Sequence, residues 1–383
     1  MPATPMIDQW SIRPTWLEID CQGVVSNYNR AKERVGSGVA VFPVVKADAY
    51  GLGAVPISRA LKAAGAPGLC VGLVEEGATL RKAGIDGPMV LFAGLTPGSE
   101  ESILDHDLTP FLYDLVQARS LSRFAQSRQR RVGCYVKVDT GMGRIGFPAP
   151  ELARAVAVIQ ALPGLRLLGI VSHLAWGDEE PSATVSAGQI SQMQTLLAQP
   201  EIERISKAHH SLANSAGILY HSRSHLDWVR PGIMLYGASP AHPRRHAQEE
   251  GLVAVVRWLS RIIQVRTVEA GTPLGYGHSH ICRKKTIIAQ IPVGYGDGYN
   301  RLLSNRGAVL IHGKRASVLG RVCMDLTSID ITEIPEARTG SLVTLLGADR
   351  TDFIGIEQMA GWMQTIPYEV ICNLGKRLAR RYL

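Results

Sequence analysis

The chain has 383 residues, of which 46% are hydrophobic and 19% charged, with 39 glycines and 21 prolines. This length and balance are typical of a globular protein that can bury a large core and form two domains, and they exclude a disordered chain. The formal net charge is +8, but the basic clusters are short, separate and not interleaved with aromatic residues, which argues against a nucleic-acid surface. A small anionic substrate or cofactor also fits a positive field.

The six cysteines are scattered and contain no C-x-x-C pair, so we expect neither a zinc site nor a disulfide framework, and no metal. The first fifteen residues lack the apolar core of a signal peptide, and no later stretch approaches the roughly 20 apolar residues of a membrane span. We therefore expect a cytoplasmic protein with no membrane partner.

A short strand over 16–20 and a helix over 21–33 open the chain. Strand-like runs and helical stretches then alternate over about 200 residues, which predicts a (β/α)8 barrel, with a doubly wound open sheet as the alternative. The eight predicted strands are 40–45, 68–74, 88–93, 108–113, 132–139, 165–173, 208–212 and 225–229.

Beyond about residue 236 the pattern changes to strand-like runs broken by Gly, Pro and Asp, with helices expected only at 354–363 and 368–380. The runs are 253–268, 285–293, 308–311, 316–319, 328–331 and 341–346. The predicted organisation is an α/β protein with an N-terminal extension (1–15), a barrel domain (16–241) and a C-terminal mostly-β domain (242–383). The first strand is also a candidate for pairing with the β domain.

Lys46 follows the continuously apolar run 40–45, as expected of a strand covered on both faces. At the carboxyl end of a barrel strand, a partly desolvated amine becomes neutral more easily and can form a Schiff base. Gly51 and Gly53 then permit a tight turn. The alternative is a lysine that only reaches solvent from the end of a buried strand.

Other polar side chains also fall where predicted barrel strands end. Lys137, Asp139 and Arg144 surround a glycine-rich turn, where Arg144 suits a planar carboxylate; the alternative is a structural ion pair between Asp139 and Arg144. His173 ends the next strand and is by default a hydrogen-bonded structural residue. Ser215 opens a short helix, where it is either an N-cap or a phosphate ligand.

Arg230 precedes Pro231-Gly232-Ile233 at the end of the eighth strand, where barrels often bind phosphate. In the second domain, Tyr276 and Tyr295 lie among glycines, where turn residues are more common than catalytic ones. The segment Cys323-Met324-Asp325 reads as a buried strand end, and Tyr368 lies at the start of the C-terminal helix.

Taken together and in order, these stretches resemble alanine racemase, a pyridoxal-phosphate enzyme of fold type III with an N-terminal barrel and a C-terminal β domain. The similarity covers essentially the whole chain, and the joint match is specific although each motif alone is weak. The matching motifs are WLEID at 16–20, VKADAYG at 45–51, KVDTGMGR at 137–144, RPGI at 230–233, RVCMD at 321–325 and PYE at 367–369.

The resemblance implies that Lys46 is the Schiff-base lysine and one base, and that Tyr276, from a second subunit, is the other base. The remaining implied roles are phosphate binding by Tyr50, Ser215, Gly232, Ile233 and Tyr368, a pyridine-nitrogen contact by Arg230, an intermediate position for His173, and substrate carboxylate binding by Arg144 and Met324. Support or access roles fall to Lys137, which is often carbamylated in the family, and to Tyr295, Cys323 and Asp325.

The implied activity interconverts L-alanine and D-alanine by a two-base mechanism through a pyridoxal 5'-phosphate external aldimine. The implied assembly is a homodimer with shared active sites, serving either peptidoglycan precursor supply or alanine catabolism. The alternatives are a racemase of broader or different specificity, for serine or lysine, a decarboxylase, and a non-catalytic pyridoxal-phosphate-binding protein. His278 and His280 depart from the family's usual smaller polar residues.

Overall fold

The computed structural model describes residues 13–178, 184–205 and 208–383. These residues form two compact units, and each is described separately. The barrel unit comprises Val24–Ala241 and Ala247–Val253. The β unit comprises the residues up to Gly23 together with His242–His246 and Ala254–Leu383.

Eight parallel strand positions follow one another in the barrel unit. They are β2 (Ala40–Val41), β3 (Leu69–Val71), β4 (Met89–Leu91), β5 (Thr109–Leu112), β6 (Val132–Asp139), β8 (Leu165–Val171), the bridging residue Ser211 and β9 (Trp228–Val229). The two-residue strand β7 (Phe147–Pro148) adds to the end of β6.

These positions close into a ring. Strands β3, β4, β5, β6 and β8 pair in that order, and β9 pairs with β2. Val44 bridges to Cys70, Val171 bridges to the seventh position, and the N–H of Trp228 donates to His210 O. A closed parallel ring has no open edge, so the predicted (β/α)8 barrel is confirmed and the doubly wound sheet is excluded.

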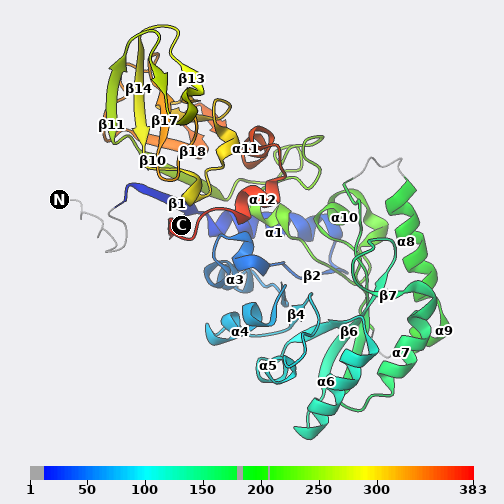
Figure 1. The fold of residues 1–383 in the computed structure, drawn as a ribbon. Coiled ribbons are helices and arrows are strands. Elements are labelled where there is room, and N and C mark those ends of the chain that lie inside the picture. The colour runs from blue at the N-terminus through cyan, green and yellow to red at the C-terminus, as the bar shows by residue number, and fades with distance from the viewer. Residues whose placement is uncertain (1–12, 179–183, 206–207) are drawn as a thin grey trace. The chain divides into compact units, whose positions relative to one another are not determined.

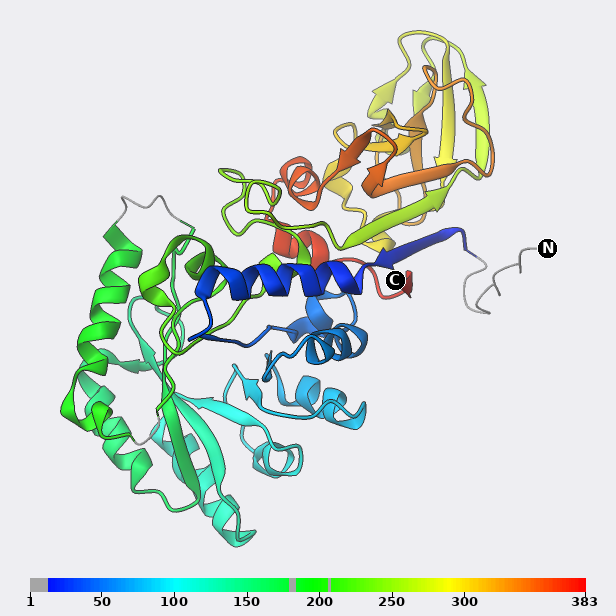
Figure 2. The same cartoon turned by 180° about the vertical axis from the view of Figure 1, so that it is seen from behind.

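Helices cover the outside of the strands (Figures 1 and 2). They are α1 (Cys21–Val35), α2 (Lys46–Tyr50), α3 (Ala54–Ala63), α4 (Val74–Lys82), α5 (Glu100–Asp105), α6 (Leu115–Ser127), α7 (Leu152–Gln160), α8 (Thr184–Leu197), α9 (Pro200–Glu203) and α10 (Ser215–Tyr220), with 3-10 turns at Ala149–Glu151, Ser222–Ser224 and Ile233–Tyr236.

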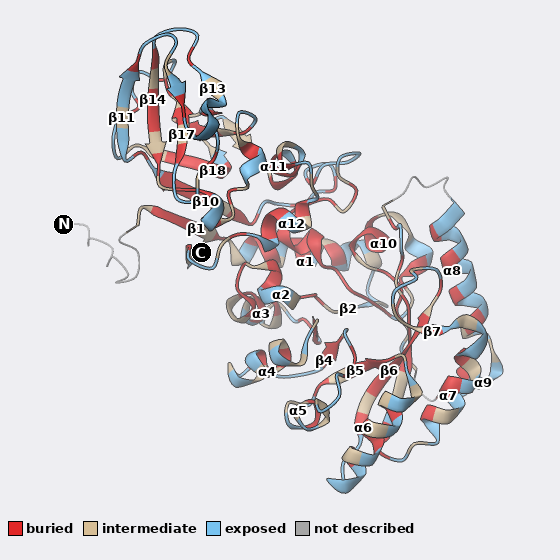
Figure 3. Ribbon diagram, in the orientation of Figure 1, coloured by how far each residue is buried: buried red, intermediate tan, exposed pale blue. Residues whose placement is uncertain are grey.

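The helix α6 illustrates why these segments are helical. Asp114 caps its first turn by accepting the N–H groups of Val116 and Gln117. Its buried residues are Ala118, Leu121, Ser122 and Ala125, which is the spacing of one helical face. Figure 3 shows the same alternation of buried and exposed positions on α6 and α7.

The β unit is built on a ten-stranded sheet in which the first and last strands of the chain are neighbours. Its order is β11-β14-β17-β16-β15-β18-β10-β1-β20, and β19 pairs with β18. The strand bounds are β1 (Thr15–Ile19), β10 (Val256–Arg261), β11 (Gln264–Val268), β14 (Thr286–Ile291), β15 (Ala308–Ile311), β16 (Lys314–Leu319), β17 (Thr327–Asp330), β18 (Leu342–Asp349), β19 (Asp352–Ile354) and β20 (Ala379–Tyr382).

A hairpin and a few helical segments complete the β unit. They are β12 (Pro273–Leu274) with β13 (His280–Ile281), the helices α11 (Ile356–Met363) and α12 (Pro367–Cys372), and 3-10 turns at Tyr276–His278, Tyr295–Asp297 and Arg301–Leu303. Trp258 and Tyr299 are fully buried in its core, with ring centroids 5.7 Å apart in an edge-to-face contact.

Three expectations about the elements are wrong. The predicted helix 368–380 stops at Cys372, because the N–H of Gly375 bonds to Asp297 O and the following residues pair with β1 as β20. The predicted strand 253–268 is two strands, since Ile262 and Ile263 send their N–H groups to different partners, Ser341 and Gln290. The predicted strands 40–45 and 208–212 shrink to two residues and a single bridge.

Candidate active site

Lys46 begins α2, whose backbone is unusual. Ala47, Asp48 and Ala49 have (φ, ψ) of (51°, 46°), (55°, 48°) and (52°, 52°), and Tyr50 has φ of 57°. This is a left-handed turn made of non-glycine residues, and each residue costs about 1–2 kcal/mol relative to right-handed backbone. Strain of this kind is typical of functional sites.

The predicted glycine turn follows the left-handed turn. Gly51 and Gly53 have φ of 86° and 105°, values that glycine adopts without a steric cost. One carboxylate oxygen of Asp48 accepts the N–H of Ala54 at 2.7 Å and so joins the turn to α3. Residues 47–50 include no glycine, the residue type that usually indicates a left-handed conformation. The sequence analysis therefore did not predict this turn.

Four of the predicted phosphate-binding residues lie together in the barrel unit. The hydroxyl of Ser215 accepts the N–H groups of Gly232 at 2.8 Å and Met234 at 3.4 Å. A Cβ at position 232 would collide with the hydroxyl of Tyr50, so the tyrosine ring packs directly against the glycine backbone and would have to move if position 232 carried a side chain. Ile233 follows and is fully buried. We call Tyr50, Ser215, Gly232 and Ile233 the anion cradle, because hydroxyls and glycine backbone without a carboxylate suit a phosphate.

Arg230 is buried at the end of β9 and is held by neutral acceptors. It donates to the hydroxyl of Ser211 at 2.5 Å and to the carbonyls of Ser172 at 2.6 Å and Leu212 at 3.1 Å. Its guanidinium also lies 5.4 Å from the ring of Trp228. Among the described residues no carboxylate pairs with it, and burial lowers its pKa to about 10. Arg230 therefore stays charged at neutral pH without an anionic partner.

This positive field perturbs the neighbouring titratable groups. Burial, and then the charge of Arg230, hold the pKa of His173 well below its usual range, so its imidazole is neutral. Burial, then Arg230 and Arg144, lower the pKa of Lys137 to about 7, against a smaller opposing effect of Asp139. The charge of Arg230 thus reaches both His173 and Lys137, as expected near a site for an anion.

The loop after β6 holds Arg144. The carboxylate of Asp139 accepts the N–H groups of Gly141 at 2.9 Å, Met142 at 2.8 Å and Gly143 at 2.9 Å, and so shapes this loop. Arg144 is exposed. Within the part of the chain that the structure describes, Asp139 and Arg144 form no ion pair, so the alternative interpretation of Arg144 as a structural partner of Asp139 is wrong.

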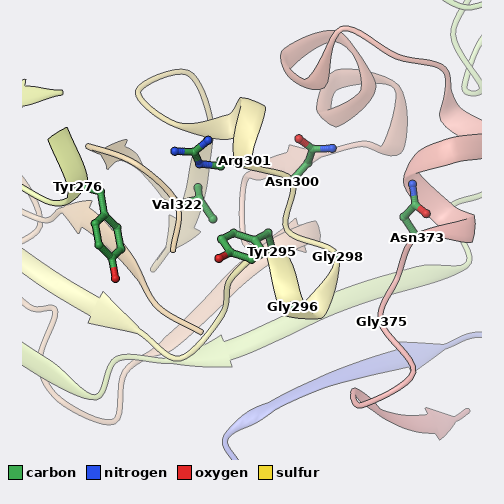
Figure 4. A pocket seen from close by; sticks show the side chains of 9 residues that line it. All are labelled: Tyr276, Tyr295, Gly296, Gly298, Asn300, Arg301, Val322, Asn373 and Gly375. Carbon is green, nitrogen blue, oxygen red and sulfur yellow. The ribbon is translucent and has the colours of Figure 1, made fainter. Parts of the chain in front are cut away.

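The predicted site residues of the β unit are far more exposed than Arg230 and Ser215 in the barrel unit. Tyr276 is 70% exposed, Tyr295 44% and Met324 53%. Tyr276 and Tyr295 line a cleft of about 620 Å³ together with Arg301 and Asn300, and Figure 4 shows both phenol rings along it. Tyr368, in α12, is half-buried.

A buried carboxylate fixes the backbone that carries Tyr295. Asp297 is fully buried and accepts hydrogen bonds from Arg13 at 2.5 and 2.7 Å and from Arg377 at 2.6 Å. Arg377 also donates to Asp325 at 2.8 Å. Burial alone would raise the pKa of Asp297, but the hydrogen bonds from Arg13, Arg377 and the N–H of Gly294 hold it below its usual range.

The segment Cys323-Met324-Asp325 is therefore next to the Tyr295 turn, and not simply a buried strand end. The N–H of Tyr295 donates to Cys323 O at 3.0 Å, and the N–H of Gly296 donates to Met324 O at 3.0 Å. Cys323 is half-buried and Asp325 exposed.

Sequence reasoning missed several residues that hold the site. Ser172 and Ser211 hold Arg230, and Arg13 and Asp297 support the Tyr295 turn from positions 284 residues apart. Glu76 also contacts the turn that carries Lys46. Only Glu76 could have been found from local sequence. It is the third residue of α4, a position where a glutamate often caps the start of a helix.

Two family models cover nearly the whole chain. The alanine racemase N-terminal domain matches residues 19–240, and the alanine racemase C-terminal domain matches residues 255–382. The chain belongs to the alanine racemase family. It is 41% identical to the alanine racemase of Syntrophobacter fumaroxidans, over 94% of this chain and 96% of that protein, and 39% identical to that of Halothermothrix orenii, over 97% of each.

Solved alanine racemases have the same fold. The enzyme of Streptomyces lavendulae superposes with a TM-score of 0.92 at 31% identity, over 97% of this chain and 98% of that one. An alanine racemase from Bartonella henselae with covalently bound pyridoxal phosphate gives 0.86 at 30% identity, over 97% and 99%. These relatives confirm the predicted activity: the protein is an isomerase that interconverts L-alanine and D-alanine.

The described residues contain neither a membrane-spanning helix nor a cluster of metal ligands. No helix there has the length and apolar character needed to cross a membrane. No group of three or more His, Cys, Asp or Glu side chains in that part of the chain is arranged to hold a metal ion.

Proposed function

We propose that this alanine racemase works with pyridoxal 5'-phosphate bound in the barrel unit and attached to Lys46, and that Lys46 and Tyr276 are its two bases. The observation that carries this proposal is the buried Arg230, which has no carboxylate partner among the described residues and lies in the same unit as the anion cradle. A negatively charged cofactor bound in the same unit would offset that charge.

The anion cradle would hold the phosphate, and Arg230 would face the pyridine nitrogen. When bound, the cofactor withdraws electrons from the α-carbon of alanine and so makes its proton acidic. Arg230 keeps its own proton, since its pKa of about 10 is well above neutrality. With the cofactor bound, Arg230 would donate a hydrogen bond to the pyridine nitrogen and would disfavour protonation there, which would restrain transamination.

Racemisation removes a proton from one face of the α-carbon and returns one to the other face. The amine of Lys46 would hold the proton on one side and the phenol oxygen of Tyr276 on the other. Free lysine and tyrosine have pKa values of about 10, so both groups need surroundings that favour the deprotonated form. The neutral imidazole of His173 and the charge of Arg230 would provide these surroundings.

Arg144 and the backbone at Met324 would receive the substrate carboxylate. Lys137 would orient Arg144 after carbamylation, a reaction in which its neutral amine adds to carbon dioxide and loses a proton. A pKa of about 7 supports this role, because an ordinary lysine is almost fully protonated at neutral pH.

Because Tyr276, Tyr295 and Met324 are exposed on the β unit, we propose that they serve the active site of a second copy of the chain, in a cytoplasmic homodimer. Cys323 and Asp325 would line the access route. A dimer of this kind loses a base when it dissociates, so specific activity falls on dilution as monomer appears in gel filtration.

The test starts from the absorbance of the purified protein and adds L-alanine in deuterated water. We expect an absorbance band at about 420 nm from the cofactor bound to Lys46. After L-alanine is added, we expect solvent-hydrogen exchange and D-alanine formation to occur together. Lys46→Ala serves as the matched control without the band. Absence of the band in the unaltered protein rejects Lys46 as the attachment site, and faster turnover of serine or lysine than of alanine would favour a broader racemase.

A further inference from the structure

The carboxylate of Glu76 connects two pieces of backbone, the turn that follows Lys46 and the segment that follows β3. One of its oxygens accepts the N–H of Ala47 at 2.7 Å. The other accepts the N–H of Gly72 at 2.7 Å and that of Leu73 at 3.2 Å. A single side chain from α4 therefore holds both the residue after Lys46 and the end of β3.

Helix capping alone does not account for this arrangement. Glu76 is the third residue of α4, and its bond to Leu73 is the usual bond from this position to the residue before a helix. That bond is the longest of the three, at 3.2 Å, whereas the two bonds of 2.7 Å leave the helix for Ala47 and Gly72. The shorter contacts thus serve the turn and the strand end.

The bond to Ala47 falls where the backbone is strained. Ala47 is the first residue of the left-handed turn, with φ of 51°, and a left-handed run of non-glycine residues forms only where surrounding contacts hold it. A charged acceptor makes a stronger hydrogen bond to a backbone N–H than a neutral one. Glu76 therefore fixes the peptide between Lys46 and Ala47 at the start of this turn.

The side chain of Lys46 passes over the residue that Glu76 also holds. A Cβ built at Gly72 would lie 3.4 Å from Cβ of Lys46, 3.7 Å from its Cδ and 3.3 Å from the carboxylate of Glu76. The lysine stem and the Glu76 carboxylate thus share the surface of Gly72. The same carboxylate accepts the N–H groups of Gly72 and Ala47. It therefore fixes both the backbone that the lysine side chain packs on and the backbone that sets the direction of that side chain.

We propose that Glu76 is the positioning residue that aims the amine of Lys46, acting through the left-handed turn and Gly72. This role rests on the proposed attachment of pyridoxal 5'-phosphate to Lys46. Glu76 does not bind the cofactor; it holds the lysine where the amine meets the cofactor's aldehyde. A misplaced reactive group slows its reaction by roughly 10-fold to 100-fold.

The experiment compares covalent attachment with plain binding in apoprotein prepared from the full chain. Stopped-flow absorbance near about 420 nm follows attachment of pyridoxal 5'-phosphate. Calorimetric titration with pyridoxamine 5'-phosphate, which has no aldehyde, measures binding without attachment. We expect E76Q to slow attachment about 10-fold or more and to bind pyridoxamine 5'-phosphate within about twofold of the unaltered protein, because the anion cradle is intact.

Glu75→Gln is the matched control, because it removes a carboxylate from the same exposed turn of α4 and leaves both measurements unchanged. Should E76Q fail to fold, E76D keeps the charge but is too short to span from α4 to Ala47, and it gives the same slow attachment. Normal attachment in the Glu76 variants overturns the proposal, and so does an equal loss of both measurements, which would make Glu76 a structural residue only. No attachment in the unaltered protein would reject the proposed function as well.

Discussion

The two units prepare their functional residues in opposite ways. In the barrel unit the key cation, Arg230, is buried and lacks a carboxylate among the described residues, whereas in the β unit the buried carboxylate Asp297 is fully matched by Arg13 and Arg377. The first arrangement leaves charge for a ligand to balance. In the second arrangement the arginines neutralise the carboxylate, and Asp297 fixes the turn that carries the exposed side chain of Tyr295. In the proposed function, the unbalanced buried charge of Arg230 would mark the ligand's position, and the balanced buried charge of Asp297 marks a structural support.

The largest expected effect comes from the two proposed bases. Lys46→Ala should reduce racemisation by at least about 10,000-fold, and Tyr276→Phe by about 100-fold to 10,000-fold, since each loses a proton carrier for one face. Assays started from each enantiomer in deuterated water check this result. Tyr276 is 70% exposed, so Tyr276→Phe keeps its unfolding temperature, and full activity in that variant would exclude Tyr276 as a base.

The second effect concerns the balanced side of the comparison. Asp297→Asn leaves Arg13 and Arg377 facing a buried amide. Loss of one partner of a fully buried ion pair costs about 3–5 kcal/mol, and because the side chains of Arg13 and Arg377 are 31% and 42% exposed, we expect a smaller loss, about 1–3 kcal/mol. Chemical denaturation that monitors the β unit measures this loss. Glu333→Gln, which breaks the exposed pair with Lys284, is the control and should change stability little.

The same carboxylate predicts a pH dependence of unfolding. The folded pKa of Asp297 lies below its unfolded value, so its contribution is fully present above the unfolded pKa, near 3.9, and is lost as the pH falls through the folded pKa. Denaturation between pH 6 and about 2 should show a flatter acid limb for Asp297→Asn than for the unaltered protein. Parallel acid limbs would contradict the depressed pKa.

A smaller expected effect concerns Lys137 in the barrel unit, near the unpaired charge of Arg230. With a pKa of about 7, its amine is mostly neutral at pH 8 and mostly protonated at pH 6, so bicarbonate should restore the activity of carbon-dioxide-depleted enzyme at pH 8 but not at pH 6. The gain should be roughly tenfold, with a mass increase corresponding to one carbon dioxide in intact-protein spectra. Lys137→Ala is the control that gains neither, and a bicarbonate effect equal at both pH values would argue against Lys137.

The smallest effect addresses the strained turn. Ala47→Gly removes a left-handed alanine on the exposed surface, and glycine adopts this conformation without the steric cost. We expect the apoprotein to gain up to about 1 kcal/mol, less the extra flexibility of the unfolded chain. Thermal unfolding measures the gain, and a clear loss of stability would show that Ala47 is not strained.

Much of this architecture is predictable from local sequence, because alternating apolar strands and amphipathic helices carry the barrel, and turns before β15, β16 and β17 separate the later strands. The residue types at strand ends, such as Lys46, His173 and Arg230, also indicate the region in which we propose the chemistry. What the sequence does not reveal depends on distant partners. Strand β20 forms because β1 lies beside it, and the pairing of Arg13 with Asp297 spans 284 residues.

The left-handed turn is a different kind of failure. Ala47 and Ala49 are ordinary helix formers, and only contacts from elsewhere, such as the one from Glu76, force them into the left-handed region. Local preference and native conformation disagree there, and such conflicts concentrate at functional sites.

The position of β1 between β10 and β20 sets an order of events on the ribosome. Strand β1 can complete its pairing only when residues 379–382 have been made, more than 350 residues later. All of the barrel strands emerge earlier, so the barrel can close while β1 still waits. A nascent chain stalled before Ala379 would therefore carry β1 with one edge unpaired, and synthesis of residues 379–382 would be the step that completes this pairing.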